Sequence, residues 1–319
     1  MSPPLRIGTR GSALALWQTE HVRARLQAAG FATERVEIRT TGDMVQHVPL
    51  AQIGGPALFT RQIDDAMLEG RIDLAVHSLK DLPTTLPPGI VLVAVDERED
   101  PRDALVGRGP VQWSDLSRGA VIATSSLRRR AQLLHLRSDL QVVDIRGNVD
   151  TRLAKLDAHP EWAAILLAAA GLVRLGFADR IGQRLPDELM LPAPGQGALA
   201  VTARAGDTAA AAAARAVHHR PTALTTGAER AFLRALEGGC QVPVAAHATL
   251  AEDGRIRLHG RVVSLRGERA VEGIETGPAQ SEAEVEALGV DLAERLLDDG
   301  AAGILAEVRA TAVPAVPEP

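Results

Sequence analysis

The 319-residue sequence predicts an α/β protein with two lobes, a cleft between them and a third, smaller α+β domain. Three observations support this prediction. Short apolar runs alternate with helical patterns over the first two-thirds of the chain, which is typical of βαβ units and a largely parallel sheet. Two stretches, 96–103 and 191–197, interrupt the series and predict crossovers between lobes, the first because charges and proline oppose burial. From about Thr222 onward, one helix, some strands and a long helix replace the alternation.

The expected elements follow from the local patterns. Apolar runs predict strands, and stretches of good helix formers predict helices. Strands are expected at 5–8, 36–38, 73–77, 90–95, 121–123, 142–145, 163–168, 246–250 and 256–263. Helices are expected at 13–29, 59–68, 226–236 and 281–298, with a low-complexity surface helix over the alanines 209–214. The expected domains are 1–96 with 195–216 for the first lobe, 101–191 for the second lobe, 220–310 for the α+β domain, and 311–319 for a disordered tail.

Composition limits the class of protein. The net charge is −5, with four Phe, three Trp and no Tyr, which argues against nucleic-acid binding. The longest nearly uninterrupted apolar run, 162–173, is too short to span a bilayer. One cysteine excludes an internal disulfide, and the N-terminal stretch lacks the apolar core of a signal peptide. We therefore expect a cytoplasmic monomer with no membrane or nucleic-acid partner.

Positive charge gathers in one part of this acidic chain, with six arginines against three aspartates between 124 and 152. Three predicted strands end in Ser, Thr or Arg residues that lead into a helix, at 9–12, 124–129 and 146–152. Helix N-termini offer unpaired N–H groups to anions, and arginine binds carboxylate or phosphate through two nitrogens. Taken singly, each Ser or Thr is better explained as an N-cap and each Arg as a solvated charge. Three such sites at strand C-termini together favour an anion-binding cleft for a small polyanion.

A fourth candidate is the segment 73–83, where a buried strand runs straight into Ser78, Lys80 and Asp81. Lys80 and Asp81 are either an exposed ion pair of little energetic value or a functional pair. In the second case Asp81 faces the cleft as an acid, base or cation-stabilising group, and Lys80 holds an anion. His77 is expected to be a satisfied, partly buried histidine rather than a base.

Cys240, the single cysteine, follows two glycines that end a helix and precedes a predicted strand. A thiol on such a turn can accept a bulky group, although a lone cysteine is commonly an inert buried residue. Residues 41–57, with Gly54 and Gly55 near their end, are either a mobile lid or an ordinary surface loop. The chain has no Walker A loop, GxGxxG fingerprint, HExxH motif or metal-spaced Cys/His cluster, so nothing implies a nucleotide or a metal.

Eight segments, in order over about three-quarters of the chain, resemble the porphobilinogen deaminase (hydroxymethylbilane synthase) family of tetrapyrrole biosynthesis. They are 6–18, 75–83, 97–104, 124–129, 146–153, 170–176, 191–198 and 237–243. The cysteine turn and the His-Ser-x-Lys-Asp-x-Pro pattern of residues 77–83 are the most specific of them. The resemblance implies two periplasmic-binding-protein-like lobes of type II and a third α+β domain that carries the cysteine.

The resemblance also implies a transferase that works on a covalent primer. Cys240 would carry a dipyrromethane cofactor through a thioether, and four porphobilinogen units would be added with loss of ammonia before linear hydroxymethylbilane is hydrolysed off. Asp81 would contact pyrrole nitrogens and stabilise cationic intermediates. The cofactor is expected at Cys240, Asp81, Lys80, Ser78, Thr124, Ser126, Arg128, Arg129 and Arg146. The substrate is expected at Arg10, Ser12, Gln18, Arg146, Arg152, Arg174 and Gln196.

One departure from the family lies in the lid. The family commonly has Gly-Gly-Lys-Gly-Leu-Phe where this chain has Gly-Gly-Pro-Ala-Leu-Phe at 54–59. Pro56 and Ala57 predict a stiffer and less basic lid, with Arg61 as a candidate for the missing charge. This departure concerns turnover or chain-length control rather than the basic reaction.

Two other functional classes compete with the transferase. One is a non-catalytic two-lobed binding protein for a small polycarboxylate, against which the third domain and its cysteine argue. The other is a cysteine hydrolase, for which the thiol would need a partner base. His218 and His219 lie nearby in the sequence, but nothing in the sequence indicates which histidine reaches Cys240.

Overall fold

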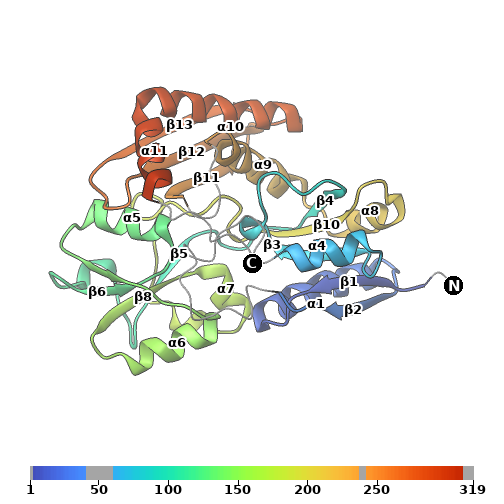
Figure 1. The fold of residues 1–319 in the computed structure, drawn as a ribbon, viewed down its shortest axis with the longest axis horizontal. Helices are drawn as coiled ribbons and strands as arrows, with labels where there is room; N and C mark the ends of the chain where they lie inside the picture. Colours follow the sequence, from blue (N-terminus) through green and yellow to red (C-terminus); the bar gives the residue numbers. More distant parts are fainter. Residues whose placement is uncertain (1–2, 41–59, 237–241, 312–319) are drawn as a thin grey trace.

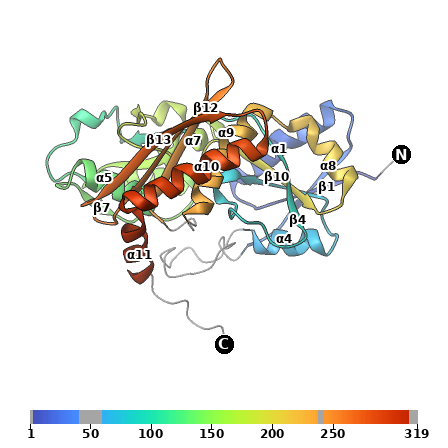
Figure 2. The same ribbon diagram turned by 90° about the horizontal axis from the view of Figure 1, so that it is seen from above.

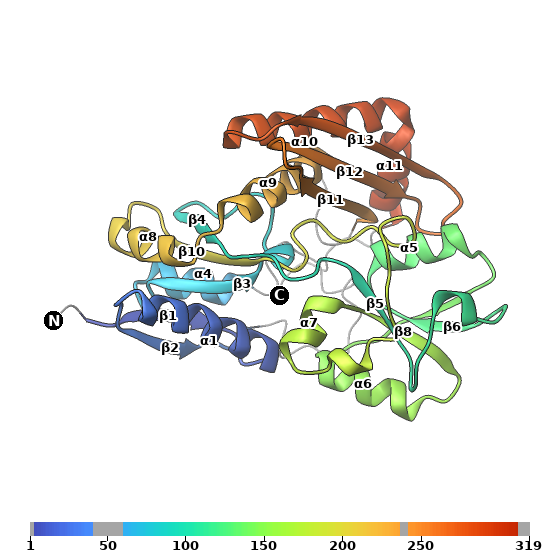
Figure 3. The same cartoon turned by 180° about the vertical axis from the view of Figure 1, so that it is seen from behind.

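The computed structural model describes residues 3–40, 60–236 and 242–311, which form three sheets with helices on their faces. Two five-stranded mixed sheets occupy the lower half of Figure 1, and a three-stranded antiparallel sheet lies above them. Figure 3 shows the same arrangement from behind. Each sheet packs its own hydrophobic cluster, so burial of apolar side chains stabilises each unit locally.

The first lobe is built on a sheet with the strand order β2–β1–β3–β10–β4. β1 pairs in parallel with β2 and β3, whereas β10 runs antiparallel to β3 and β4. Its elements are β1 (Leu5–Thr9), α1 (Ala13–Ala28), β2 (Thr33–Glu37), α4 (Arg61–Leu68), β3 (Leu74–Ser78), β4 (Ile90–Val95), β10 (Leu199–Arg204) and α8 (Thr208–Ala214). α1 begins after Ser12, whose hydroxyl accepts a hydrogen bond from the N–H of Ala15, and it buries Ala15, Val22 and Leu26 at helical spacing.

The second lobe has the strand order β7–β6–β8–β5–β9, with β6 parallel to β7 and β8, and β5 antiparallel to β8. Its elements are β5 (Asp103–Val106), β6 (Val121–Ala123), α5 (Leu127–Leu136), β7 (Gln141–Val143), α6 (Val149–Ala158), β8 (Trp162–Ala168), α7 (Ala169–Arg174) and β9 (Gln183–Arg184). In each lobe, the strand that follows a crossover runs antiparallel to its neighbours in the sheet. This strand is β10 in the first lobe and β5 in the second lobe. This is the type II two-lobed arrangement, and the predicted fold class is confirmed.

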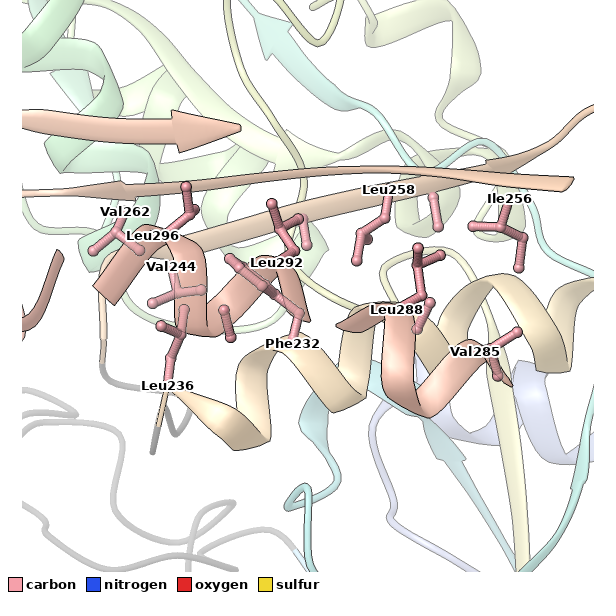
Figure 4. Close-up of a cluster of buried hydrophobic side chains, with 14 of the residues drawn as sticks. Phe232, Leu236, Val244, Ile256, Leu258, Val262, Val285, Leu288, Leu292 and Leu296 are labelled. Atoms are coloured by element: carbon pink, nitrogen blue, oxygen red, sulfur yellow. The ribbon is translucent and has the colours of Figure 1, made fainter. Parts of the chain in front are cut away.

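The third domain packs two helices on one face of its sheet. Its elements are α9 (Arg220–Ala235), β11 (Val244–Leu250), β12 (Arg255–Val263), β13 (Ala270–Pro278), α10 (Glu282–Leu296) and α11 (Ala302–Thr311). Figure 2 shows α10 running obliquely across the domain, and Figure 4 shows Phe232 among the leucines of α10 and β12. A Cβ at Gly289 would lie 2.5 Å from the carbonyl oxygen of Ala228, so α9 and α10 approach backbone to backbone.

The structure corrects several local predictions. The predicted surface helix over the alanines is present as α8, but one face of it, with Ala210, Ala213 and Ala214, is buried in the core of the first lobe. The first crossover is not exposed throughout, because its first and last residues, Asp96 and Asp103, are 1% and 0% exposed. The strands β10 and β13 and the helix α11 were not expected, because alanine-rich or glycine-containing segments give weak periodic patterns.

Other predictions on the ends of elements and domains have mixed outcomes. Thr311, placed in the disordered tail, is the last residue of α11. The rest of that tail and the predicted lid at 41–57 lie outside the described residues. The domain limits stay predictions.

Truncating Phe232 should destabilise the third domain more than truncating an exposed apolar residue of the same domain. The ring is 0% exposed, and a Cβ at Gly260 would lie 2.5 Å from its Cζ atom, so the ring fills the space between α9 and β12. We expect Phe232→Ala to lower the free energy of unfolding by about 3–5 kcal/mol, measured by urea denaturation. Leu250→Ala, at a position 39% exposed, is the control and should change it by less than about 1 kcal/mol. Equal effects of the two changes would contradict this account of the core.

Candidate active site at the lobe boundary

Most of the predicted ligand-binding residues come from the ends of β3 and β6 and the starts of α5 and α6. After β3 the chain makes a 3₁₀ turn that carries Lys80 and Asp81. After β6, the hydroxyl of Ser126 accepts a hydrogen bond from the N–H of Arg129 at 3.4 Å and caps α5. The hydroxyl of Thr124 accepts one from the N–H of Ser126 at 3.3 Å. These two hydroxyls therefore stabilise the start of α5, and the N-terminus of a helix favours an anion.

A fully buried carboxylate, Asp103 at the start of β5, gathers the basic residues of α5. One carboxylate oxygen accepts from Nη1 of Arg128 at 2.6 Å, and the other accepts from Nε and Nη2 of Arg129 at 3.0 and 2.7 Å. Burial alone would raise the pKa of Asp103, but the two arginines outweigh it and hold that pKa well below its usual range. Asp103 was not predicted as a site residue; its one signal in the sequence was its place at the end of a charged crossover.

Gln196 connects this buried cluster to the first lobe. Its amide nitrogen donates to Asp103 at 2.9 Å and to the carbonyl of Pro101 at 2.7 Å, and its amide oxygen accepts from Nζ of Lys80 at 3.2 Å. Burial lowers the pKa of Lys80 to about 8; Asp81 opposes this shift and Arg129 adds to it. Lys80 of the first lobe and Arg129 of the second lobe thus share one electrostatic cluster.

Arg152, on α6, belongs to the same cluster. Its Nε donates to the carbonyl of Gly147 at 2.8 Å. Burial and, to a smaller extent, the charges of Arg129 and Arg146 lower the pKa of Arg152 to about 10, against the opposing charge of Asp81 across the lobe boundary. Among the residues that the structure describes, the carboxylate of Asp81 makes no hydrogen bond or ion pair.

The remaining first-lobe candidates are held by hydrogen bonds within that lobe. Gln18, which is 3% exposed, donates from its amide nitrogen to the hydroxyl of Ser78 at 2.9 Å. Ser12 is the cap of α1. His77 is 6% exposed and lies 3.4 Å from the hydroxyl of Thr202. Burial, aided by the charge of Arg10, lowers the pKa of His77 to about 4, so it is a neutral structural histidine, as predicted.

Arg174, the last residue of α7, connects the two lobes. Its Nη2 donates to the carbonyl of Gly197 at 2.6 Å, and its guanidinium carbon lies 5.6 Å from the ring centroid of Trp17 on α1. Burial lowers the pKa of Arg174, while Glu99 and Asp96 of the first crossover raise it. Its charge therefore acts at the crossover rather than beside Asp81.

Among the residues that the structure describes, the basic side chains around Asp81 outnumber the carboxylates. The cations are Lys80, Arg128, Arg129, Arg146 and Arg152, and the carboxylates are Asp81, Asp103 and Asp144. Holding like charges together out of water is unfavourable, and the lowered pKa values of Lys80 and Arg152 reflect it. Ligand carboxylates would compensate this excess, so the residues present fit a group with several carboxylates, as a dipyrromethane has.

Cys240 lies outside the described residues, in the connection between α9 and β11. Within residues 3–40, 60–236 and 242–311, no group of three or more His, Asp, Glu or Cys side chains could hold a metal ion. No helix in these same ranges is long and apolar enough to cross a membrane.

Fold and site together define a two-lobed α/β protein with a cation-rich site at the lobe boundary and a third α+β domain. The sequence profile described as "Porphobilinogen deaminase, dipyromethane cofactor binding domain" matches residues 5–212, and "Porphobilinogen deaminase, C-terminal domain" matches residues 223–298. The chain belongs to the porphobilinogen deaminase family. This confirms the predicted family and the tetrapyrrole-forming transferase activity predicted with it.

Relatives named porphobilinogen deaminase are similar to this chain over nearly its full length. That of Geobacter metallireducens is 52% identical over 95% of this chain and 94% of its own. That of Desulforudis audaxviator is 51% identical over 96% and 98%, and that of Syntrophotalea carbinolica is 48% identical over 99% of each. Among solved structures, the methionine binding protein MetQ matches 67% of this chain and 89% of its own with a TM-score of 0.43 and 12% identity.

The charge state of Lys80 can be measured directly, because Lys80 and Lys155 are the only lysines of the sequence. In cofactor-free Cys240→Ser protein with labelled lysines, we expect the NMR signal of Lys80 to titrate near pH 8. Lys155→Arg assigns the two signals. Because the folded-state pKa is below the unfolded value, the unfolded chain binds more protons between about pH 8 and 10.5, and the contribution of Lys80 to stability rises over that window. Titration at the ordinary lysine value would contradict the burial argument.

Proposed function

We propose that this chain catalyses the hydroxymethylbilane synthase reaction, joining four porphobilinogen molecules head to tail with loss of ammonia and releasing linear hydroxymethylbilane. The observation that supports it most directly is one carboxylate, Asp81, among cations from both lobes. A pyrrole that loses its amine becomes cationic, and a fixed carboxylate lowers the energy of that charge. The acetate and propionate groups of each pyrrole require the surrounding cations.

Asp81 is the catalytic residue of this proposal, and its turn is held from both sides. The N–H of Leu79 donates to the carbonyl of Ala198 at 3.0 Å, and the N–H of Leu82 donates to the carbonyl of Leu79 at 3.2 Å. The side chains of Leu79 and Leu82 are buried in the first lobe. A carboxylate held in this way needs little reorganisation when charge develops beside it.

The basic residues divide by how their donors are used. Arg128 and Arg129 are bonded to Asp103 and to the carbonyls of Leu191 and Leu166, so we assign them a mainly electrostatic role toward cofactor carboxylates. We assign the cofactor also to Lys80, Ser78, Thr124, Ser126 and Arg146. We assign porphobilinogen and the growing chain to Arg10, Ser12, Gln18, Arg146, Arg152, Arg174 and Gln196.

Cys240 is proposed to hold the dipyrromethane through a thioether. When bound, that group supplies the free pyrrole carbon to which the first porphobilinogen is joined. Cys240 is the one thiol of the chain, in the connection from α9 to β11. A thiol that must stay reduced until it is alkylated fits the cytoplasm. We propose that the protein acts there as a monomer, with domain limits at 1–96 with 195–216, 101–191 and 220–310.

The intact mass of the denatured protein tests the attachment. Protein from cells that make porphobilinogen should be heavier than its sequence by two linked pyrrole units, because a thioether survives denaturation. The Cys240→Ser protein should have the mass of its sequence alone. An unmodified mass for the wild-type protein would remove the covalent primer and, with it, the proposed reaction.

Replacing Asp81 by Asn should nearly abolish turnover and leave the fold intact. The amide keeps the size of the side chain but loses the charge that stabilises a cationic pyrrole, so we expect kcat to fall by about a hundredfold or more. The melting temperature should not change, because Asp81 has no ion pair among the described residues. Asp65→Asn, at an exposed position on α4, is the matched control. Rates near those of the wild type would withdraw the catalytic role of Asp81.

A further inference from the structure

We propose that Arg230, on α9 of the third domain, is a positioning residue that fixes the segment after Asp81 against the helix that precedes Cys240 in the chain. This inference rests on the proposed function, since Asp81 is the catalytic residue of that proposal. It adds a residue outside every segment that pointed to the family, and it gives the third domain a part in the geometry of the site.

The guanidinium of Arg230 donates to three consecutive carbonyl groups of the first lobe. Its Nη2 lies 2.8 Å from the carbonyl oxygen of Pro83 and 3.3 Å from that of Thr84, and its Nη1 lies 3.4 Å from that of Leu82. α9 and β4 are in contact, and Figure 3 shows α9 between the sheet of the third domain and the strands of the first lobe. These oxygens directly follow the turn that carries Asp81.

The segment 82–84 depends on this contact because its own backbone offers little support. Leu82 is extended, with φ −78° and ψ 138°, and Pro83 has no N–H to donate. In the described part of the chain, no backbone N–H donates to the carbonyl oxygens of Leu82, Pro83 or Thr84. A charged guanidinium therefore supplies the hydrogen bonds that a helix or a strand supplies elsewhere.

The other end of the contact is a rigid helix. Glu229, the residue before Arg230, is fully buried and accepts hydrogen bonds from the N–H groups of Gly195 and Ala248, both within 2.8 Å, and from Arg98. Phe232, two residues on, fills the core of the third domain. α9 ends at Ala235, a few residues before Cys240 in the sequence, so Arg230 connects this helix of the third domain to the segment that follows Asp81.

Arginine suits this position and the chain offers a control one turn away. A planar guanidinium has five N–H donors and can bond three carbonyl groups at once, whereas lysine offers one nitrogen. Arg234 lies on the same helix but pairs with Glu286 of α10 at 2.8 Å, within the third domain. Arg234→Met therefore removes a similar charge from α9 without touching the loop of Asp81.

The test compares Arg230→Met with Arg234→Met in the loaded, full-length protein. We expect Arg230→Met to lower kcat, per protein molecule that carries the adduct, by about tenfold to a hundredfold with KM changed less than about twofold, as for a displaced catalytic group. The backbone amides of residues 79–86 should exchange hydrogen faster, both in the loaded protein and in the cofactor-free Cys240→Ser background. Arg234→Met should leave kcat and these amides unchanged.

If Arg230→Met does not fold, Arg230→Lys replaces it in the test, because lysine keeps the charge but offers fewer donors. We expect its loss of kcat to be intermediate. A kcat of Arg230→Met equal to that of the wild type, or a loss of kcat without faster exchange at 79–86, overturns the proposal. An equal loss in Arg234→Met overturns it too. Failure of the proposed function would be seen separately, as wild-type protein without an adduct, whatever the Arg230 variants do.

Discussion

The geometry of this protein depends on one buried carboxylate, that of Asp103. Both chain crossovers contribute to the contacts of this carboxylate. Asp103 is the last residue of the first crossover and the first residue of β5, and Gln196 of the second crossover donates a hydrogen bond to it. Arg128 and Arg129 complete the cluster from α5. Leaving a buried charge without its partner costs about 3–5 kcal/mol, so each of the four residues constrains the other three. Two lobes made from interleaved parts of the chain thereby meet in one arrangement.

That arrangement explains why the site is charged before any ligand arrives. Asp103 neutralises part of the charge of Arg128 and Arg129. The pKa values of Lys80 and Arg152 are lowered because burial and neighbouring cations both disfavour their charged forms. A solvated cluster would relax by turning its side chains into water. Here hydrogen bonds to Gln196 and to the carbonyl of Gly147 hold the cations in place, which is the preorganisation that electrostatic catalysis requires.

Much of this could be predicted from local sequence, and the reasons differ by residue. The strand-to-helix junctions at Ser12 and Ser126 could be predicted from capping chemistry. The position of Asp81 at the edge of the sheet could be predicted because Asp81 follows a buried strand. Asp103 could not be found in the same way, because its role depends on arginines brought to it by the pairing of β5 with β8, and a charged crossover normally indicates exposure. The helix α8 was predicted, but its buried face was not, because a run of alanines has no apolar stripe to indicate which side is buried.

The third domain takes part in the same constraint, because it contacts both lobes at the elements that carry the site. On the first lobe, Arg230 holds the segment that follows Asp81. On the second lobe, Arg261 of β12 donates to the amide oxygen of Gln132 at 3.0 Å, on the helix whose start carries Arg128 and Arg129. Arg261 is buried there. Separating the lobes would therefore break one of these two contacts and leave Arg230 or Arg261 without its hydrogen-bond partner. A domain attached only as a carrier of the cysteine would need neither contact; this one opposes any movement that takes Asp81 away from the cations of α5.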